Sequence, residues 1–393
     1  MLNFDSFSKK MPHMLLGEIV DFYDNKRKPI KASERTEGPY PYYGANGIQG
    51  TINNFIFNEP LILLAEDGGH FGDETKSIAY IASGKYWVNN HAHVLKPKPE
   101  IDISYLCRAL EKYDVRPYIK GATREKLTKG NAEAIPIPIP FKNGKPDLKE
   151  QKRIAAILDK ADELRRKRQE SLKMLDELVQ SVFLDMFGDP VTNPKGWNIK
   201  TLEDISDIQG GLQVTSKRAT KPIEVPYLRV ANVYRDKLML NEIKNIRVDD
   251  NELQRTSLLE GDILIVEGHG NRNEIGRSAM WDGSISPCVH QNHLIRVRVK
   301  KNHALPLIIS NFINSSGGRK QLLKFGKTTS GLNTISTRNV KALEIFQPPM
   351  ELQRKYYEIT KYIAEISNYY NFSDIKFDTF NNSLLQKAFK GEL

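Results

Sequence analysis

Two stretches of the chain place apolar residues at alternating steps of three and four, which is the spacing of a helix that packs along one side. In the first stretch these residues are Ile154, Leu158, Ala161, Leu172, Leu175, Val179 and Val182. In the second stretch, an apolar or aromatic residue recurs every seven positions, at Tyr356, Ile363, Tyr370, Phe377 and Leu384. The pattern predicts two long helices, each with an apolar stripe that needs a partner.

The two predicted helices are copies of one another. The segment Gln151–Phe187 returns, shifted by 202 positions, as Gln353–Phe389. An internal repeat outranks local signals in predicting a fold. We therefore expect the helices to pack antiparallel and to bury a common seam, made of Leu175, Leu178, Val182, Phe377, Phe380 and Leu384.

The ends of both helices carry recognisable signals. Acidic residues within 147–150 favour a helix start, and Gly188-Asp189-Pro190 ends the first helix. The second helix follows Pro348-Pro349, and the poor helix formers at 371–374 predict a local break in it. At about 1.5 Å per residue, each helix would make a strut of roughly 55 Å.

A longer module of short strands and turns precedes each helix. In the first module, Leu61–Ala65 and Ile78–Ile81 predict strands, and Ile103–Tyr113 predicts a helix. The second module repeats this plan loosely. Residues 62–69 are echoed by 263–270, and His93-Val94-Leu95 is echoed by His293-Leu294-Ile295.

These elements together predict an α+β fold. We expect two mixed α/β domains and an antiparallel pair of long, coiled-coil-like helices, with an internal repeat. The predicted parts are a first domain (1–146), a central helix (147–188), a second domain (189–348) and a C-terminal helix (349–393).

Composition adds charge to this picture. The 393 residues carry a net charge of +10, which favours a polyanionic partner through release of counterions. Cys107 and Cys288 are the only cysteines, so neither a disulfide framework nor a cysteine zinc site is indicated. No signal peptide or membrane-length apolar run is present. We expect a cytoplasmic protein that does not enter a membrane.

Motifs for catalysis are not found. The sequence has no phosphate-binding Gly-x-x-x-x-Gly-Lys-[Ser/Thr] loop, no dinucleotide fingerprint, no serine nucleophile elbow and no amino-methyltransferase signature. The nearest approach to a metal site is His91-x-His93, with Asp67 and His70 nearby. The alternative is that His93 and His293 serve packing or hydrogen bonding at a strand edge.

Polar residues that could contact DNA gather instead at the turns of both modules. Asn, Gln and Arg side chains can pair with base edges. The candidates for base contacts at these turns are Tyr43, Asn46, His70, Asn90 and His91 in the first module and Arg229, Asn232, His269, Asn271, Arg272, Gln291 and Asn292 in the second. Two basic segments suit phosphate contacts, through Thr123, Arg124 and Lys126 and through Lys327, Thr328 and Thr329. Because loops are generally rich in such residues, the alternative that any single one is an ordinary loop residue is the favoured one.

Several segments together resemble a known family. Phe183–Pro190 with Pro194–Trp197, the closing Leu384–Leu393, and Ile137–Pro140 ahead of Glu150–Ile154 are similar to the spacer segments of specificity subunits of type I restriction-modification systems. The resemblance covers essentially the whole chain. The recognition modules of that family vary freely, so it transfers no base-contacting residue.

Membership in the family would imply a non-catalytic DNA-binding subunit, with its two domains related by a pseudo-two-fold axis and separated by the antiparallel helix pair. Each target-recognition domain would read one half of an asymmetric, bipartite site in double-stranded DNA. Modification (methyltransferase) subunits, expected to number two, and restriction (translocase and nuclease) subunits would dock on the helices. S-adenosylmethionine, ATP and Mg would bind those partners, and this chain would hold no cofactor, metal or catalytic residue. The alternatives are a non-catalytic RNA-binding adaptor and a divergent nuclease or methyltransferase.

Overall fold

The computed structural model describes residues 11–73, 75–120, 125–329 and 332–393. The chain divides into two compact units. Unit 1 comprises Met1–Gln169 and Asn371–Leu393, and unit 2 comprises Glu170–Tyr370. Both long helices contribute a segment to each unit, and each unit is described by itself.

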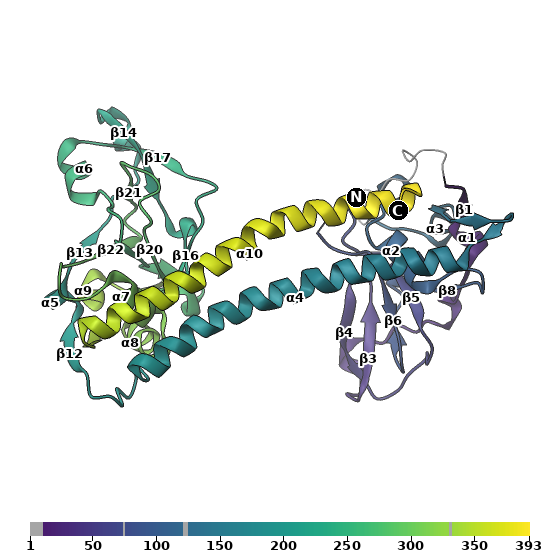
Figure 1. Ribbon diagram of the computed structural model, residues 1–393, viewed down its shortest axis with the longest axis horizontal. Coiled ribbons are helices and arrows are strands. Elements are labelled where there is room, and N and C mark those ends of the chain that lie inside the picture. Colours follow the sequence, from purple (N-terminus) through teal and green to yellow (C-terminus); the bar gives the residue numbers. More distant parts are fainter. Residues whose placement is uncertain (1–10, 74, 121–124, 330–331) are drawn as a thin grey trace. The chain divides into compact units, whose positions relative to one another are not determined.

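Unit 1 is built around a four-stranded antiparallel sheet in the order β2-β8-β5-β6, next to a three-stranded sheet in the order β4-β3-β7 (Figure 1). Its strands are β1 (His13–Leu15), β2 (Val20–Phe22), β3 (Tyr40–Gly44), β4 (Gly47–Ile52), β5 (Leu61–Ala65), β6 (Ala79–Ala82), β7 (Trp87–Val88), β8 (Ala92–Pro97), β9 (Pro136–Pro138), β10 (Phe141–Lys142) and β11 (Lys145–Pro146). Its short helices are α1 (Leu16–Ile19), α2 (Ile103–Glu111) and α3 (Lys129–Glu133), with 3-10 turns at Asp24–Lys26, Ala32–Glu34 and Arg116–Tyr118.

Strand β5 explains why the sequence shows an unbroken apolar run there. All five of its residues are buried. Ile62 and Leu64 face a core that includes α2 and the ends of the long helices, whereas Leu61 and Leu63 face a second core around Tyr86. A strand covered on both faces has no polar side, so its sequence does not alternate.

Unit 2 repeats this architecture. A four-stranded antiparallel sheet in the order β13-β22-β18-β20 lies beside a three-stranded sheet in the order β17-β14-β21. The strands are β12 (Asn198–Thr201), β13 (Ser206–Gly210), β14 (Ile223–Leu228), β15 (Val233–Tyr234), β16 (Lys237–Leu238), β17 (Lys244–Val248), β18 (Ile263–Val266), β19 (Gly268–His269), β20 (Ser278–Met280), β21 (Val289–His290), β22 (Leu294–Val299), β23 (Lys327–Thr329), β24 (Leu332–Thr334) and β25 (Glu344–Gln347).

The short helices of unit 2 are α5 (Leu202–Ile205), α6 (Asp250–Thr256), α7 (Pro306–Asn314), α8 (Ser316–Phe325) and α9 (Thr337–Lys341), with 3-10 turns at Ser216–Thr220, Val230–Asn232 and Arg272–Glu274. Helix α7 contributes Ile308, Ile309 and Phe312 to the core that also buries Ile263 and Ile265 of β18. It therefore occupies the position that α2 has in unit 1.

The long helices are α4 (Leu148–Phe187) and α10 (Met350–Lys390). The carboxylate of Asp147 accepts hydrogen bonds from the backbone N–H groups of Lys149 and Glu150, both at 3.1 Å, which is an N-terminal cap at the predicted position. The predicted break at 371–374 is wrong, because α10 continues through these residues. Low helix propensity costs only a few tenths of a kcal/mol per residue, which a long helix tolerates.

Within unit 1 the two helix segments run antiparallel. The guanidinium of Arg153 donates to the backbone oxygen of Leu393, and that of Arg168 donates to the hydroxyl of Ser373. As residue number rises along α4, it therefore falls along α10. The direction agrees with the prediction.

The seam prediction is only partly correct. Leu175, Val182, Phe377 and Leu384 are half-buried, but Leu178 is 45% exposed and Phe380 is 55% exposed. The fully buried apolar residues of the helices are those that pack into a domain core, such as Phe183 and Phe389. The helices are thus buried mainly by the domains at their ends and not by a continuous seam.

A glutamine near the start of each long helix, Gln151 or Gln353, forms hydrogen bonds with the backbone of the domain. Gln151 accepts a hydrogen bond from the backbone N–H of Asp102 (2.9 Å), the residue that precedes α2, and donates to Glu100 O (3.1 Å). Gln353 accepts one from the N–H of Leu305 (2.9 Å), the residue that precedes α7, and donates to Pro348 O (2.8 Å). Both glutamines are almost fully buried.

Candidate nucleic-acid interface

Three loops converge in unit 1, at the carboxyl end of β5. The amide of Asn46, in the β3–β4 turn, donates to Gly68 O at 2.9 Å. The imidazole of His91 pairs with the carboxylate of Asp67. The N–H of Asn89 donates to Tyr43 O at 3.0 Å. The structure therefore brings together the loops that carry Asn46, His70, Asn90 and His91.

Tyr43 does not have the free side chain expected of a base-contacting residue. Its ring lies against Tyr80 and Tyr86, with ring centroids 5.7 and 5.6 Å away. The Tyr80 hydroxyl in turn donates to Gly44 O. This aromatic cluster supports the β3–β4 hairpin, whereas Asn46 and Asn90 are exposed.

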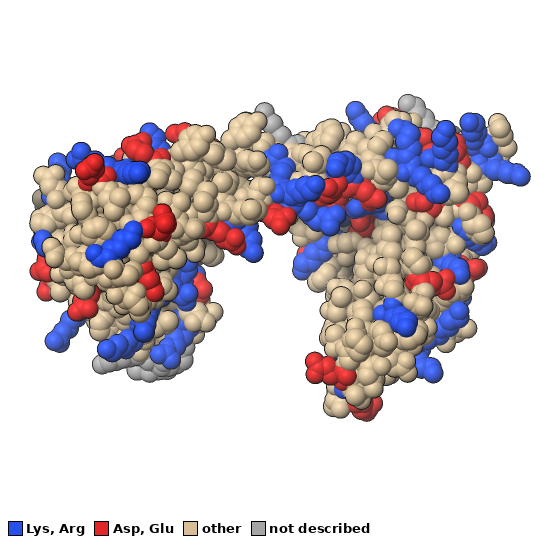
Figure 2. Space-filling view, turned by 60° about the horizontal axis from the view of Figure 1, so that its bottom comes forward, with Lys and Arg blue, Asp and Glu red and all other residues tan. Residues whose placement is uncertain are grey.

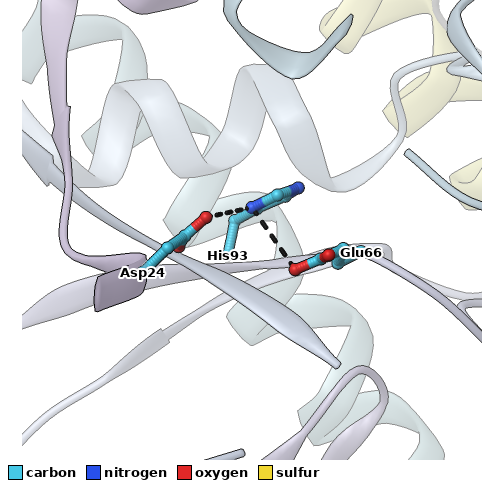
Figure 3. Close-up of side chains that lie close together, drawn as sticks. All are labelled: Asp24, Glu66 and His93. Carbon is cyan, nitrogen blue, oxygen red and sulfur yellow. Dashed lines mark hydrogen bonds and ion pairs between the residues drawn. The ribbon is translucent and has the colours of Figure 1, made fainter. Parts of the chain in front are cut away.

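A buried ionic network lies beneath these loops. His93, on β8, places Nδ1 2.6 Å from Asp24 and Nε2 2.8 Å from Leu127 O. Glu66, directly after β5, pairs with Arg27 at 2.6 Å and with Lys126 at 2.9 Å. Figure 3 shows Asp24, Glu66 and His93 pointing toward one another.

The two carboxylates of the network favour their charged forms. Burial would raise the pKa of Glu66, but hydrogen bonds from Arg27 and Lys126 outweigh it and leave this pKa below its ordinary value. Burial acts on Asp24 in the same way, and the hydrogen bond and charge of His93 outweigh it. Because Lys126 and the backbone of Leu127 belong to the network, it also fixes the end of the basic segment that begins at Lys120.

The ligand atoms of Asp24, Glu66 and His93 lie within 4.8 Å of one another, as in a metal site. The surrounding charges do not suit a metal ion, because Arg27 and Lys126 already neutralise Glu66. The imidazole of His93 also has an oxygen partner on each nitrogen. Moreover, His91 pairs with Asp67 and not with this group, so the expected His91-x-His93 pair is split between two contacts.

The corresponding loops of unit 2 form a small sheet. Strand β19 pairs with β24, which pairs with β23, so His269 lies opposite Asn333 and the predicted phosphate segment 327–329 lies one strand further. The amide of Asn333 donates to Gly270 O at 3.1 Å. Asn271 and Arg272 are exposed beside this sheet. The structure thus brings His269, Asn271 and Arg272 close to the second basic segment.

Asn232 is not available to contact DNA, contrary to our prediction. It is 2% exposed, its amide donates to Met239 O (2.8 Å) and Glu242 O (3.0 Å), and it accepts from the N–H of Arg229. Asn232 therefore holds the loop after β14. The guanidinium of Arg229 also has a partner within the protein, because it forms an ion pair of 2.7 Å with Glu242.

Backbone hydrogen bonds define which loop residues of the two units are equivalent. The N–H of Glu66 donates to His91 O, and that of Glu267 donates to His293 O, both at 2.9 Å. His91 therefore corresponds to His293, and the predicted match of His93 with His293 is wrong by two residues. Strand pairing places Ile295 opposite Ile265, where His93 lies opposite Leu64.

By the same register, Asn89 and Asn90 correspond to Gln291 and Asn292. The N–H of Gln291 donates to Leu228 O at 2.9 Å, as Asn89 does to Tyr43 O. Gln291 and Asn292 are half-buried. The structure places both at the turn before β22, next to the small sheet of unit 2.

Some predicted residues cannot be assigned contacts. Thr123 and Arg124 lie outside the described residues. The backbone of Lys327, Thr328 and Thr329 forms β23, and their side chains are not described. The prediction that these residues contact phosphates remains a prediction.

Sequence reasoning missed Arg27, which joins Glu66 to the carbonyl of Ala92. Its partners lie 39 and 65 residues away in the chain, so no local spacing could have indicated it. Asn89, in the same polar run as the predicted Asn90 and His91, is buried, and its amide donates to Gln49 at 3.0 Å.

On the face that Figure 2 presents, positive charge is distributed and not concentrated. Figure 2 shows lysine and arginine side chains over both units, interspersed with carboxylates, on the face that it presents. Arg165, Arg166 and Lys167 on α4 each lie near a carboxylate of the preceding turn, Asp162 or Glu163. Within the described residues, no helix is both long and apolar enough to span a bilayer.

Comparison with known proteins decides the family. The family described as type I restriction modification DNA specificity domain matches this chain twice, over residues 9–174 and 194–369. The chain belongs to this family. The two matches coincide with the duplicated modules, so each module with its following helix segment is one copy of the family's domain.

Individual proteins similar to this chain carry names from the same family. A putative type I restriction enzyme specificity subunit of Haemophilus influenzae is 26% identical over 360 residues, which cover 90% of this chain and 87% of that protein. The EcoKI specificity subunit of Escherichia coli K12 is 26% identical over 328 residues, covering 76% of this chain and 68% of that protein.

Solved structures share the fold. The S subunit of a type I restriction-modification system from M. genitalium superposes with a TM-score of 0.55 at 14% identity, covering 99% of this chain and 97% of that chain. A chain from a structure concerned with complex assembly and conformational transition of a type I system gives 0.58 at 15% identity, covering 99% and 100%.

Proposed function

We propose that this chain is the subunit that directs a type I restriction-modification complex to a bipartite DNA sequence. Each domain reads one half of the site through the loops at the carboxyl end of its central strand, β5 or β18. The observation that carries the proposal is the equivalence of these loops. In both domains the same backbone hydrogen bonds join the central strand to the turn before β8 or β22.

Exposed polar side chains at those loops supply the chemistry for reading bases. Asn46 and Asn90 in the first domain and Asn271 and Arg272 in the second are exposed. Amide and guanidinium groups form paired hydrogen bonds with base edges in the major groove. Neighbouring basic residues would contact phosphates, which fix the register of the protein on the duplex.

The remaining parts of the complex would attach to the long helices. Modification and restriction subunits would dock there, supply the chemistry of methylation and cleavage, and bind S-adenosylmethionine, ATP and Mg. The helices carry exposed apolar and aromatic residues, including Met174, Leu178, Tyr362 and Tyr369, which suit a protein partner. This chain would then be a non-catalytic recognition subunit.

The test uses the complex assembled from this chain and the modification subunits encoded with it. Its methylation motif is determined by sequencing methylated DNA, and its affinity is measured for a duplex with that motif, a scrambled duplex and an RNA of equal length. We expect a motif in two separated parts and preference for the matching duplex. Equal binding of the scrambled duplex would disprove sequence-specific recognition, and tighter binding of the RNA would favour an RNA adaptor.

A further inference from the structure

Two arginines of unit 2 converge on one point beside the loop that carries His269 and Asn271. Arg235, in the β15–β16 turn, and Arg319, on α8, each place Nη2 3.3 Å from Asn273 O. The two nitrogens are therefore no farther apart than twice that distance. Such a separation lets both guanidinium groups reach the same small anion.

Neither guanidinium forms an ion pair with a carboxylate among the described residues. The nearby Glu274 is paired with Arg277 at 2.9 Å, and Asp236 accepts a hydrogen bond of 2.6 Å from Asn314. The contacts that Arg235 and Arg319 do make, to Asn273 O and from Arg235 to Asn314 Oδ1 (3.4 Å), are long and involve neutral oxygens. Neither guanidinium is therefore neutralised by a direct ion pair, although the charges of Glu274 and Asp236 act on Arg235 from nearby.

Electrostatics supports this description. Burial and, next, the charge of Arg319 lower the pKa of Arg235 from its ordinary value, and these two effects outweigh the opposing charges of Glu274 and Asp236. Two like charges held together this way repel each other unless an anion lies between them. The exposed Arg272 lies nearby, because its guanidinium donates to Leu323 O at 3.4 Å, on the same helix as Arg319.

We propose that Arg235 and Arg319 form a clamp for one phosphate of the DNA backbone. This inference rests on the proposed function. A phosphodiester offers two non-bridging oxygens, and each can accept charge-assisted hydrogen bonds from a guanidinium. Because Asn273 follows His269 and Asn271 in the same loop, a phosphate held here fixes the position of that loop over the neighbouring bases without reading sequence.

The test measures affinity of the assembled complex for its own motif and for a scrambled duplex between about 50 and 200 mM salt. In the double variant Arg235→Gln and Arg319→Gln, we expect the slope of log affinity against log salt to fall in magnitude by about 0.9, the contribution of one phosphate. Affinity should fall equally for both duplexes, and the methylated motif should not change. Arg319→Lys keeps the charge and should keep the slope.

Arg247→Gln is the matched control, because Arg247 lies in the same domain and is already paired with Glu224 at 3.2 Å. Its slope should equal that of the wild type. Should the double variant not fold, Arg319→Gln alone carries the test, since that side chain makes a single long hydrogen bond.

Three results would overturn the clamp. One is a wild-type slope in the folded variant, and another is an altered motif, which would mean that these arginines contact bases. The third is stabilisation of the wild type by inorganic phosphate, lost in the variant, with an unchanged slope for DNA, which would indicate a site for free phosphate. If the wild-type complex itself does not prefer its motif, the proposed function fails first, and the two failures are thus distinguishable.

Discussion

Gln353 offers the sharpest test of how the long helices are fixed to the domains. Its side chain satisfies two buried backbone groups, the N–H of Leu305 and the carbonyl of Pro348. In Gln353→Ala both groups lose their partner inside the protein. A buried polar group left without a partner costs about 1 to 3 kcal/mol, so the loss of two such partners should cost unit 2 about 2 to 6 kcal/mol.

This loss should be visible as a local change in melting. For a unit of this size, 1 kcal/mol shifts the melting temperature by about 2 to 4 °C, so the transition of unit 2 should fall by roughly 4 to 24 °C. Hydrogen exchange gives the local readout. The Leu305 amide should exchange faster in the variant, whereas the Asp102 amide, held by the equivalent Gln151, should exchange as in the wild type.

Two further variants separate the causes. Gln353→Met fills the same volume without hydrogen bonds and should remain destabilised. Gln386→Ala removes an exposed glutamine of the same helix and should change nothing. A methionine variant as stable as the wild type, with normal exchange at Leu305, would refute the idea that these hydrogen bonds anchor the helix.

Other predictions address pH, modularity and spacing. Burial lowers the pKa of His290 to about 4. The unfolded chain binds a proton at this residue below about pH 6.5 and the folded protein does not, so stability should fall by up to about 3 kcal/mol between pH 6.5 and 4. His290→Asn should flatten that dependence in denaturant titrations, and the exposed His303→Asn should not. Replacing residues 14–140 by the module of another family member should change one half of the methylated motif. A change in both halves would contradict independent domains. Lengthening α4 and α10 in register should widen the unread spacer while both half-sites stay the same, and an unchanged spacer in an active variant would show that the helices do not set it.

Much of the fold could be predicted because its signals are local or repeated. The apolar periodicity and the 202-residue repeat indicated α4 and α10, and the unbroken run at 61–65 indicated a strand, whose burial on both faces the structure then showed. Burial along the helices was harder to predict. Leu178 and Phe380 occupy seam positions by spacing, yet they are exposed, because which apolar residues are covered depends on where a domain packs.

The candidate site was predictable as a set of loops but not residue by residue. The sequence indicated the turns at 44–47, 67–70 and 89–91, which the structure brings together. The sequence could not show that the Asn232 amide donates hydrogen bonds to Met239 O and Glu242 O inside the protein. A buried structural asparagine and an exposed recognition asparagine look alike in a sequence. The two-residue error at His93 has a similar origin, since the histidines themselves were matched and not the strand register.

The two domains show how one frame can carry different recognition loops. In the first, His93 and Glu66 belong to a charged network, whereas in the second the position of His93 is taken by the aliphatic Ile295. The backbone hydrogen bonds around these positions are nevertheless the same, from Glu66 to His91 and Leu127 and from Glu267 to His293 and Ile335. Backbone groups are present whatever the side chain, so these bonds hold the loops without constraining their sequence. Side chains at the loop tips can then change, and with them the bases that are read, at little cost to the fold beneath.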